Sequence, residues 1–105
     1  MHVAILGAGA LGTLFGAAAW RGGGAEVTLI GRGGRHLDAV DADGVTLVAM
    51  DGSRSVLRGA GLRTASGTNR VQEPIDYLVV AVKGGEFPAA IEAAAALPPI
   101  GCVLT

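Results

Sequence analysis

A glycine-rich segment near the N-terminus is the clearest chemical signal in the sequence. It has the spacing G-x-G-x-x-G and directly follows a short apolar run, His2–Leu6. This spacing between a strand and a helix is typical of a turn that binds the pyrophosphate of a dinucleotide, because backbone N–H groups and the positive end of the helix dipole face the phosphates. The alternative is a glycine-rich turn without a ligand. The candidate cofactor-binding residues in this segment are Gly7, Ala8, Gly9, Ala10, Leu11 and Gly12.

Each glycine of the segment has a separate physical task. Gly7 allows the tight turn out of the strand, and Gly9 lacks the Cβ that would keep a pyrophosphate from the backbone. Gly12 lets the helix lie close to the strand, and Gly16, one turn later, is expected to extend that packing.

A second strand is expected at 27–30, and the residues that follow it indicate which dinucleotide would bind. An acidic residue there would bind the ribose 2′-hydroxyl of NAD. No Asp or Glu occurs between Val27 and His36, and Arg32 follows the strand instead. An arginine can hold a 2′-phosphate and stack on adenine. The sequence therefore predicts NADP(H), with Arg32 as the selecting residue and Arg35 either in support or as a solvated helix residue.

Composition narrows the class of protein. The 105 residues suit one domain or part of a larger one, and half of them are apolar. A net charge of −1 gives no basic excess for nucleic acid or for an anionic membrane surface. No Lys or Arg precedes the apolar run 1–19, which argues against a secretory signal. The single cysteine, Cys102, excludes an internal disulfide and is expected to be a small core residue, and no Cys/His cluster suggests a metal site. A cytoplasmic protein is expected.

Strand and helix patterns alternate along the chain. Strands are expected at 2–6, 27–30, 45–50, 55–58, 62–65, 77–82 and 102–105, and helices at 10–21, 35–43 and 86–97. This order predicts an α/β fold with a Rossmann-like, doubly wound, mostly parallel sheet. The pair Asp51-Gly52 favours a β-hairpin insertion. The apolar residues at helical spacing, expected to face inward, are Leu11, Leu14, Phe15, Ala18 and Ala19, then Leu37 and Val40, then Phe87, Ile91 and Ala94.

Taken together, these motifs resemble the N-terminal domain of ketopantoate reductase (2-dehydropantoate 2-reductase). The resemblance rests on the glycine segment, Leu29–Arg32, the hairpin start Gly44–Leu47 and Val80–Lys83. It implies NADPH-dependent reduction of the 2-oxo acid ketopantoate to pantoate, in pantothenate and coenzyme A biosynthesis. It also implies that the glycines hold the pyrophosphate, Arg32 the 2′-phosphate, and that Lys83 lies near the nicotinamide. Without the resemblance, Lys83 reads more readily as a solvent-exposed lysine at a helix start.

The resemblance further implies a second, helical domain that supplies the lysine and acid needed to bind and protonate the substrate. That domain is absent from the 105 residues. Residues 1–105 are therefore expected to be an NADP-binding domain cut from a longer protein, and the less favoured alternative is that 102–105 form a terminal edge strand. Because hydride transfer to a ketone needs a positioned acid, we assign no catalytic residue in this chain. We expect it to bind NADP(H) with little turnover.

Two other functions stay open on the residues alone. The chain could be the cofactor domain of another NADP-dependent 2-oxo acid or hydroxyacid dehydrogenase. It could also be a non-enzymatic nucleotide-sensing module, but such modules usually carry an acid where Arg32 stands.

An apolar sheet edge left uncovered would favour a homodimer or aggregation.

Overall fold

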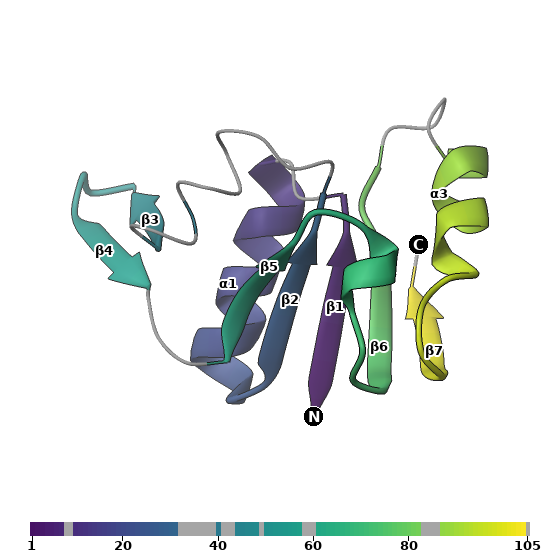
Figure 1. The fold of residues 1–105 in the computed structure, drawn as a ribbon. Helices are drawn as coiled ribbons and strands as arrows, with labels where there is room; N and C mark the ends of the chain where they lie inside the picture. The colour runs from purple at the N-terminus through teal and green to yellow at the C-terminus, as the bar shows by residue number, and fades with distance from the viewer. Residues whose placement is uncertain are drawn as a thin grey trace.

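The architecture is a five-stranded parallel sheet with helices on both faces (Figure 1). The structure is a computed structural model that describes residues 1–7, 10–31, 40, 44–48, 50–57, 61–82 and 87–104. The strand order is β5-β2-β1-β6-β7, and neighbouring strands are parallel throughout. The strands are β1 (His2–Leu6), β2 (Glu26–Ile30), β5 (Leu62–Ala65), β6 (Ile75–Val80) and β7 (Ile100–Leu104). The predicted Rossmann-like, doubly wound sheet is confirmed.

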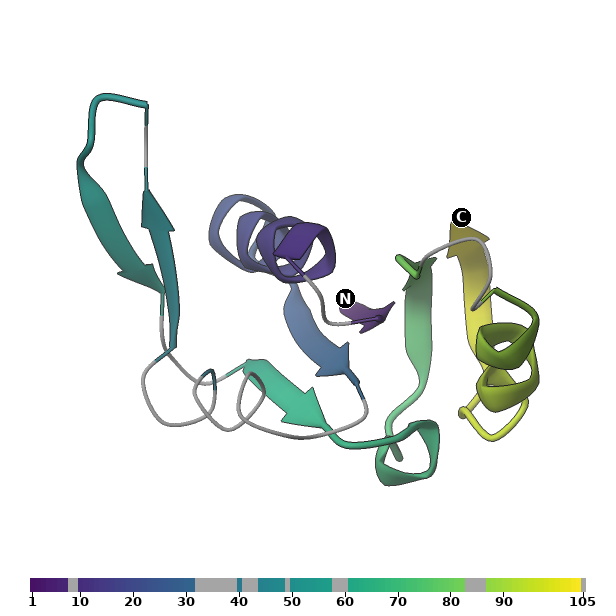
Figure 2. The ribbon, with the colours of Figure 1, turned by 90° about the horizontal axis from the view of Figure 1, so that it is seen from above.

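Helices cover the two faces of this sheet separately. Helix α1 (Ala10–Gly23) lies on one face, and helix α3 (Phe87–Ala94) lies on the other, as the view from above shows (Figure 2). The short 3-10 helix η1 (Thr68–Arg70) follows β5 and was not predicted. Strand β1 is buried along its whole length because it is central and both faces are covered.

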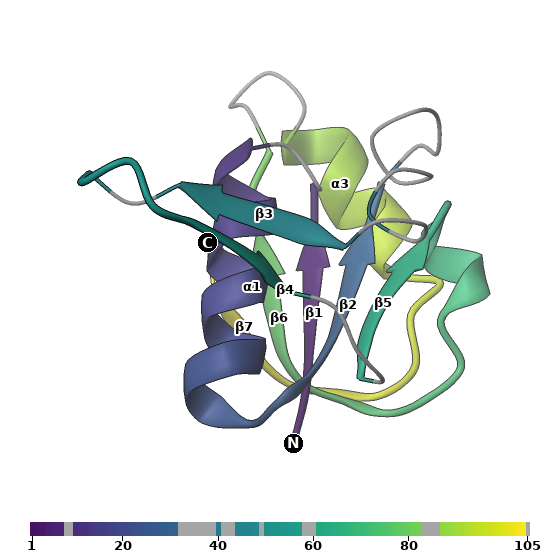
Figure 3. The same ribbon diagram turned by 90° about the vertical axis from the view of Figure 1, so that its left-hand side faces the viewer.

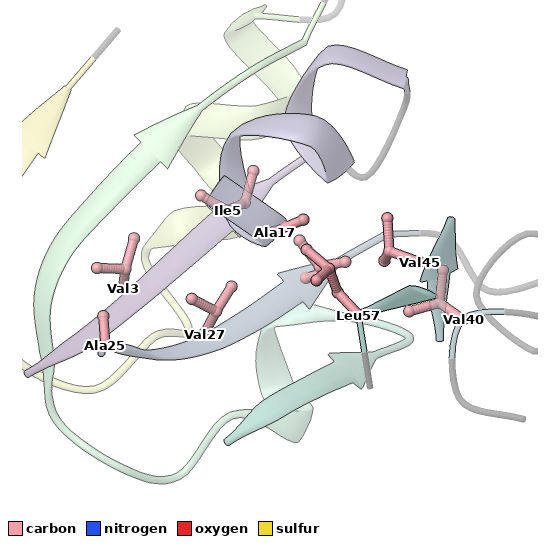
Figure 4. Packing of buried hydrophobic residues seen from close by; sticks show 9 residues of the cluster. Val3, Ile5, Ala17, Ala25, Val27, Val40, Val45 and Leu57 are labelled. Carbon is pink, nitrogen blue, oxygen red and sulfur yellow. The ribbon is translucent and has the colours of Figure 1, made fainter. Parts of the chain in front are cut away.

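Alternate residues of the central strands build two hydrophobic clusters. On the α1 side, Val3 and Ile5 pack with residues of β2, α1 and the hairpin. On the other side, Ala4 and Leu6 pack with residues that include Leu78 and Ala90. Figure 4 shows the cluster on the α1 side, whose members are Val3, Ile5, Ala17, Ala25, Val27, Leu29, Val40, Val45 and Leu57.

The inner face of α1 differs from the predicted one. Phe15 is half exposed and Ala18 is exposed, whereas Gly12, Thr13, Gly16 and Ala17 are buried. A Cβ on Gly16 would lie 2.7 Å from Cδ2 of Leu29, so the helix approaches the sheet more closely than large side chains allow. Small residues therefore occupy the contact. The helix also extends two residues beyond the predicted end, to Gly23, and is followed by Gly24 in the left-handed region (φ +63°).

The predicted hairpin is present as a separate two-stranded sheet. Strand β3 (Val45–Val48) pairs antiparallel with β4 (Arg54–Leu57), and Asp51-Gly52 lies in the connection, with Gly52 at φ +87°. Both strands differ from the prediction, since β3 ends two residues earlier and β4 begins and ends one residue earlier. Val45 and Leu57 are buried at the base of the hairpin, which projects away from the parallel sheet (Figure 2).

The last part of the chain brings two corrections. Cys102 was expected in the core but is exposed, because β7 is an edge strand and the α1 side of that edge is not covered among the described residues. Ile91 was expected to face inward but is exposed, and its neighbour Ala90 is buried instead. Strand β6 begins two residues before the predicted start and ends at Val80. The predicted helix 35–43 lies outside the described residues except for Val40, which is buried as expected.

Candidate functional site

The carboxyl ends of four neighbouring strands meet at one edge of the sheet (Figure 3). Backbone hydrogen bonds continue the pairing one residue past the strands. The N–H of Gly7 donates to the carbonyl of Ile30 at 2.9 Å, and that of Gly31 donates to Ala65 at 3.0 Å. The N–H of Ala81 donates to Leu6 at 2.8 Å. These bonds fix the strand ends relative to one another at the edge where open α/β sheets bind ligands.

Gly7 lies where this edge leaves no space for a side chain. Its φ of +102° is in the region that favours glycine. A Cβ on Gly7 would also lie 2.7 Å from the carbonyl oxygen of Ala81 and 2.7 Å from Cγ1 of Val82. The chain leaving β1 therefore passes directly against the chain leaving β6. The strand order changes direction between β1 and β6, which makes this the topological switch point of the sheet.

Gly12 places the first turn of α1 against the same point. A Cβ on Gly12 would clash with the carbonyl oxygen of Gly7 and lie 3.2 Å from Cγ2 of Ile5. The helix therefore begins beside the end of β1, as the sequence predicts. Within α1 no acidic residue lies in the first turn, and Arg21 lies in the last. The positive end of the helix dipole thus faces the carboxyl edge without a carboxylate in the helix's own first turn, which suits an anionic ligand.

The other predicted site residues are described only in part. Ala10 and Leu11 open helix α1. Ala8, Gly9, Arg32 and Lys83 lie outside the described residues, as does Arg35. Their predicted roles toward a cofactor stay predictions, supported by the places of their sequence neighbours. Arg32 follows Gly31 at the end of β2, and Lys83 follows Val82 beyond the end of β6.

Sequence reasoning missed the residues of this edge that come from β5 and β6. Ala81 limits the space at Gly7, and Ser66 follows the β5 residue that pairs with the end of β2. Neither belongs to a motif. The signal that could have found them is positional, because strands β2, β5 and β6 of a parallel sheet end at the same edge.

The amino edge of the sheet carries a separate polar cluster around His2. The His2 ring is buried, with Nδ1 2.9 Å from the carbonyl oxygen of Pro74 and Nε2 2.8 Å from Oγ1 of Thr28. Because a carbonyl only accepts, Nδ1 carries a proton, and in the neutral ring Nε2 accepts the Thr28 hydroxyl proton. The backbone N–H of His2 also donates a hydrogen bond to Oδ2 of Asp76 at 2.7 Å.

This cluster has a structural role and does not belong to the candidate site. Gly7 lies five positions after His2 along extended chain, which is about 16 Å at roughly 3.3 Å per position. His2 therefore cannot protonate a substrate at the carboxyl edge. In the described part of the chain, no three His, Cys, Asp or Glu side chains come together as a metal site. No helix among the described residues is long and apolar enough to span a membrane.

The parallel sheet, its strand order and the glycine contacts at the switch point define a Rossmann-like domain. The sequence also matches the family described as ketopantoate reductase PanE/ApbA over residues 3–104. The chain therefore belongs to the ketopantoate reductase family and corresponds to its N-terminal domain. None of the curated protein sequences is significantly similar to it.

Solved structures agree with this assignment of the fold. A ternary structure of D-mandelate dehydrogenase with NADH and anilino(oxo)acetate is 24% identical, with a TM-score of 0.77 over all of this chain and 33% of that one. A protein from Enterococcus faecalis assigned as a 2-dehydropantoate 2-reductase is 26% identical, with a TM-score of 0.75 over all of this chain and 34% of that one. The 2-dehydropantoate 2-reductase from Methylococcus capsulatus is 18% identical, with a TM-score of 0.69 over 90% of this chain and 30% of that one. The chain thus spans about a third of the length of these proteins.

Proposed function

We propose that this chain is the NADP(H)-binding part of an oxidoreductase that reduces a 2-oxo acid, with ketopantoate as the substrate. The observation that carries the proposal is the closed glycine contact at the switch point. Gly7 and Gly12 bring β1, β6 and the first turn of α1 together so that backbone replaces side chains at the edge. A pyrophosphate can then approach the backbone N–H groups at the start of α1.

We expect NADP(H) to be preferred over NAD(H) because of Arg32, the second residue after β2. Gly31 is bonded to Ala65 at the carboxyl edge, and Arg32 is next in the chain. A guanidinium there attracts a 2′-phosphate, and the acid that would bind a free 2′-hydroxyl is lacking between Val27 and His36. The D-mandelate dehydrogenase structure contains NADH, so the fold alone does not decide between the two cofactors.

Ketopantoate is proposed as the substrate from family membership alone. The described residues place no acid at the carboxyl edge that could protonate a substrate there. Among them, Asp76 and Glu26 lie at the amino ends of their strands. A ketone that accepts a hydride needs a proton from a positioned acid, so we expect the 105-residue chain to bind the cofactor without efficient turnover. The bound nicotinamide would supply the hydride, and this chain would hold and orient it.

Calorimetric titration with NADPH and with NADH tests the proposal. We expect NADPH to bind more tightly, and Arg32→Ala to weaken NADPH binding by about 10- to 100-fold, the effect of losing one or two charge-assisted hydrogen bonds. Arg21→Ala is the matched control, since it removes the same charge at the far end of α1. A folded sample that binds neither cofactor would overturn the proposal, and equal losses in both variants would remove Arg32 as the selecting residue.

A further inference from the structure

The carboxyl end of β5 lies at the same edge of the sheet as the carboxyl end of β2. The proposed function assigns no role to the residues at the end of β5. Strand β5 pairs with β2 in the register Val27↔Leu62 to Ile30↔Ala65. The Gly31 N–H continues that pairing by donating to the Ala65 carbonyl at 3.0 Å. One residue further, Ser66 lies opposite Gly31, at a spacing of about 5 Å between neighbouring strands.

Ser66 has the exposure and the free polar group that a ligand contact requires. The residue is exposed, and its hydroxyl has no hydrogen-bond partner among the residues that the structure describes. Its polar neighbours are engaged differently. Thr68 is buried, and Oδ1 of Asn69 lies 2.9 Å from where a Cβ on Gly67 would be, so that side chain lies over Gly67.

The charges along this segment suit an anion. From Ser66 to Gln72 the sequence contains no carboxylate, and its one charged residue is Arg70. The nearest acids in the sequence are Glu73, which is paired with Arg63 at 2.6 Å, and Asp76, which accepts the His2 N–H at the amino edge. A phosphate beside Gly31 would therefore meet no opposing carboxylate from the described part of β5 or of the segment that follows it.

We propose that Ser66 is a specificity-determining residue for NADP(H), whose hydroxyl donates a hydrogen bond to the ribose 2′-phosphate from the β5 side of the site. The inference rests on the proposed function and adds a second element to it. In the proposed function Arg32, in the sequence after β2, supplies the charge, and Ser66, directly after β5, supplies a neutral donor. Discrimination between the two cofactors is thereby shared between a charge and a neutral donor.

Two substitutions at Ser66 separate these contributions. Ser66→Ala removes one hydrogen bond to a charged group, so we expect NADPH affinity to fall about tenfold while NADH affinity is unchanged. Ser66→Asp places a carboxylate where the 2′-phosphate would lie. We expect it to weaken NADPH binding by at least 100-fold and to leave NADH binding equal or stronger, since a carboxylate accepts a bond from the free 2′-hydroxyl. The matched control is Gln72→Glu, which adds the same charge to an exposed position near Pro74.

The experiment is a calorimetric titration of the 105-residue chain and its variants with NADPH, NADH and adenosine 2′,5′-bisphosphate. The bisphosphate has the adenosine end without the nicotinamide, so the same loss on this probe places the effect at the 2′-phosphate. Ser66 variants that keep the wild-type NADPH:NADH ratio would overturn the inference and leave the proposed function intact. A wild-type chain that binds neither cofactor would overturn the proposed function instead. Thermal unfolding of each variant checks that this exposed substitution leaves the fold unchanged.

Discussion

Three glycines of α1 should respond with different signs when each is replaced by alanine. In a helix, alanine is favoured over glycine by about 0.5–1 kcal/mol, because glycine loses more conformational freedom on folding. At Gly22 this gain is unopposed, since no described atom lies within 4 Å of where its Cβ would be. Gly22→Ala should therefore stabilise the chain by about 0.5 kcal/mol, the lower end of the range, because the position is close to the helix end.

At Gly12 the same gain is outweighed by steric conflict. The new Cβ would clash with the Gly7 carbonyl oxygen, a backbone atom held by the hydrogen bond from Gly7 to Ile30, and would lie 3.2 Å from Cγ2 of Ile5. Overpacking of this kind costs about 1–3 kcal/mol. Gly12→Ala should therefore destabilise the chain by about 0.5–2 kcal/mol. Gly16→Ala meets the side-chain atom Cδ2 of Leu29 at 2.7 Å, and because that side chain can adjust, its cost should lie between the other two.

Equilibrium unfolding in urea, followed by circular dichroism, measures all three variants against the wild type. In thermal unfolding, a change of 1 kcal/mol corresponds to about 4–8 °C for a domain of this size. The order of stability should be Gly22→Ala, wild type, Gly16→Ala and Gly12→Ala. If Gly12→Ala stabilises the chain as Gly22→Ala does, the first turn of α1 is not packed against the end of β1, and the geometry of the candidate site is refuted.

Two further predictions concern hydrogen bonds away from the site. Thr28→Val leaves Nε2 of the buried His2 without its partner at 2.8 Å and should cost about 1–3 kcal/mol of stability, whereas a change below 0.5 kcal/mol in urea unfolding would contradict the described cluster. The Ser53 hydroxyl and N–H hold the pKa of Asp51 below its ordinary value of 3.8, so its stabilising effect is present above pH 3.8 and is lost as the pH falls through the lower value. Ser53→Ala removes the hydroxyl bond and keeps the backbone one, so an NMR titration of this variant should show the pKa of Asp51 moved part of the way back toward 3.8, and an unchanged value would show that the hydroxyl bond does not form in solution.

The central strands could be predicted because burial on both faces leaves a simple pattern. The run His2–Leu6 contains branched apolar residues without alternation, and the structure gives β1 those bounds. The Asp51-Gly52 pair identified the hairpin for a local reason, since Gly52 adopts a positive φ. The bounds of β3 and β4 could not be predicted as well, because the pairing register is set where Val45 and Leu57 enter the core.

The errors arose where packing, not local sequence, decides the exposure of a residue. Phe15 and Ile91 are apolar and helical in spacing, but α1 and α3 approach the sheet through Gly16 and Ala90, and the larger residues are displaced outward. Cys102 lies in an apolar run that suggests a buried strand, yet its strand is at the edge and the residue is exposed. At the site, the glycine spacing located Gly7 and Gly12. It could not identify Ala81 or Ser66, which reach the edge through strand order.

The position of the bound dinucleotide is tested most directly by mapping where NADPH contacts the 105-residue chain, with backbone amide NMR signals followed during a titration. The central claim is that the dinucleotide lies across the carboxyl edge of β1, β2 and β6. We expect large shifts for Gly7, Gly12, Gly31 and Ala81, and little change for Glu26 and Asp76 at the amino edge. Shifts concentrated at the amino edge or on the hairpin, with Gly7 and Gly12 unaffected, would contradict it.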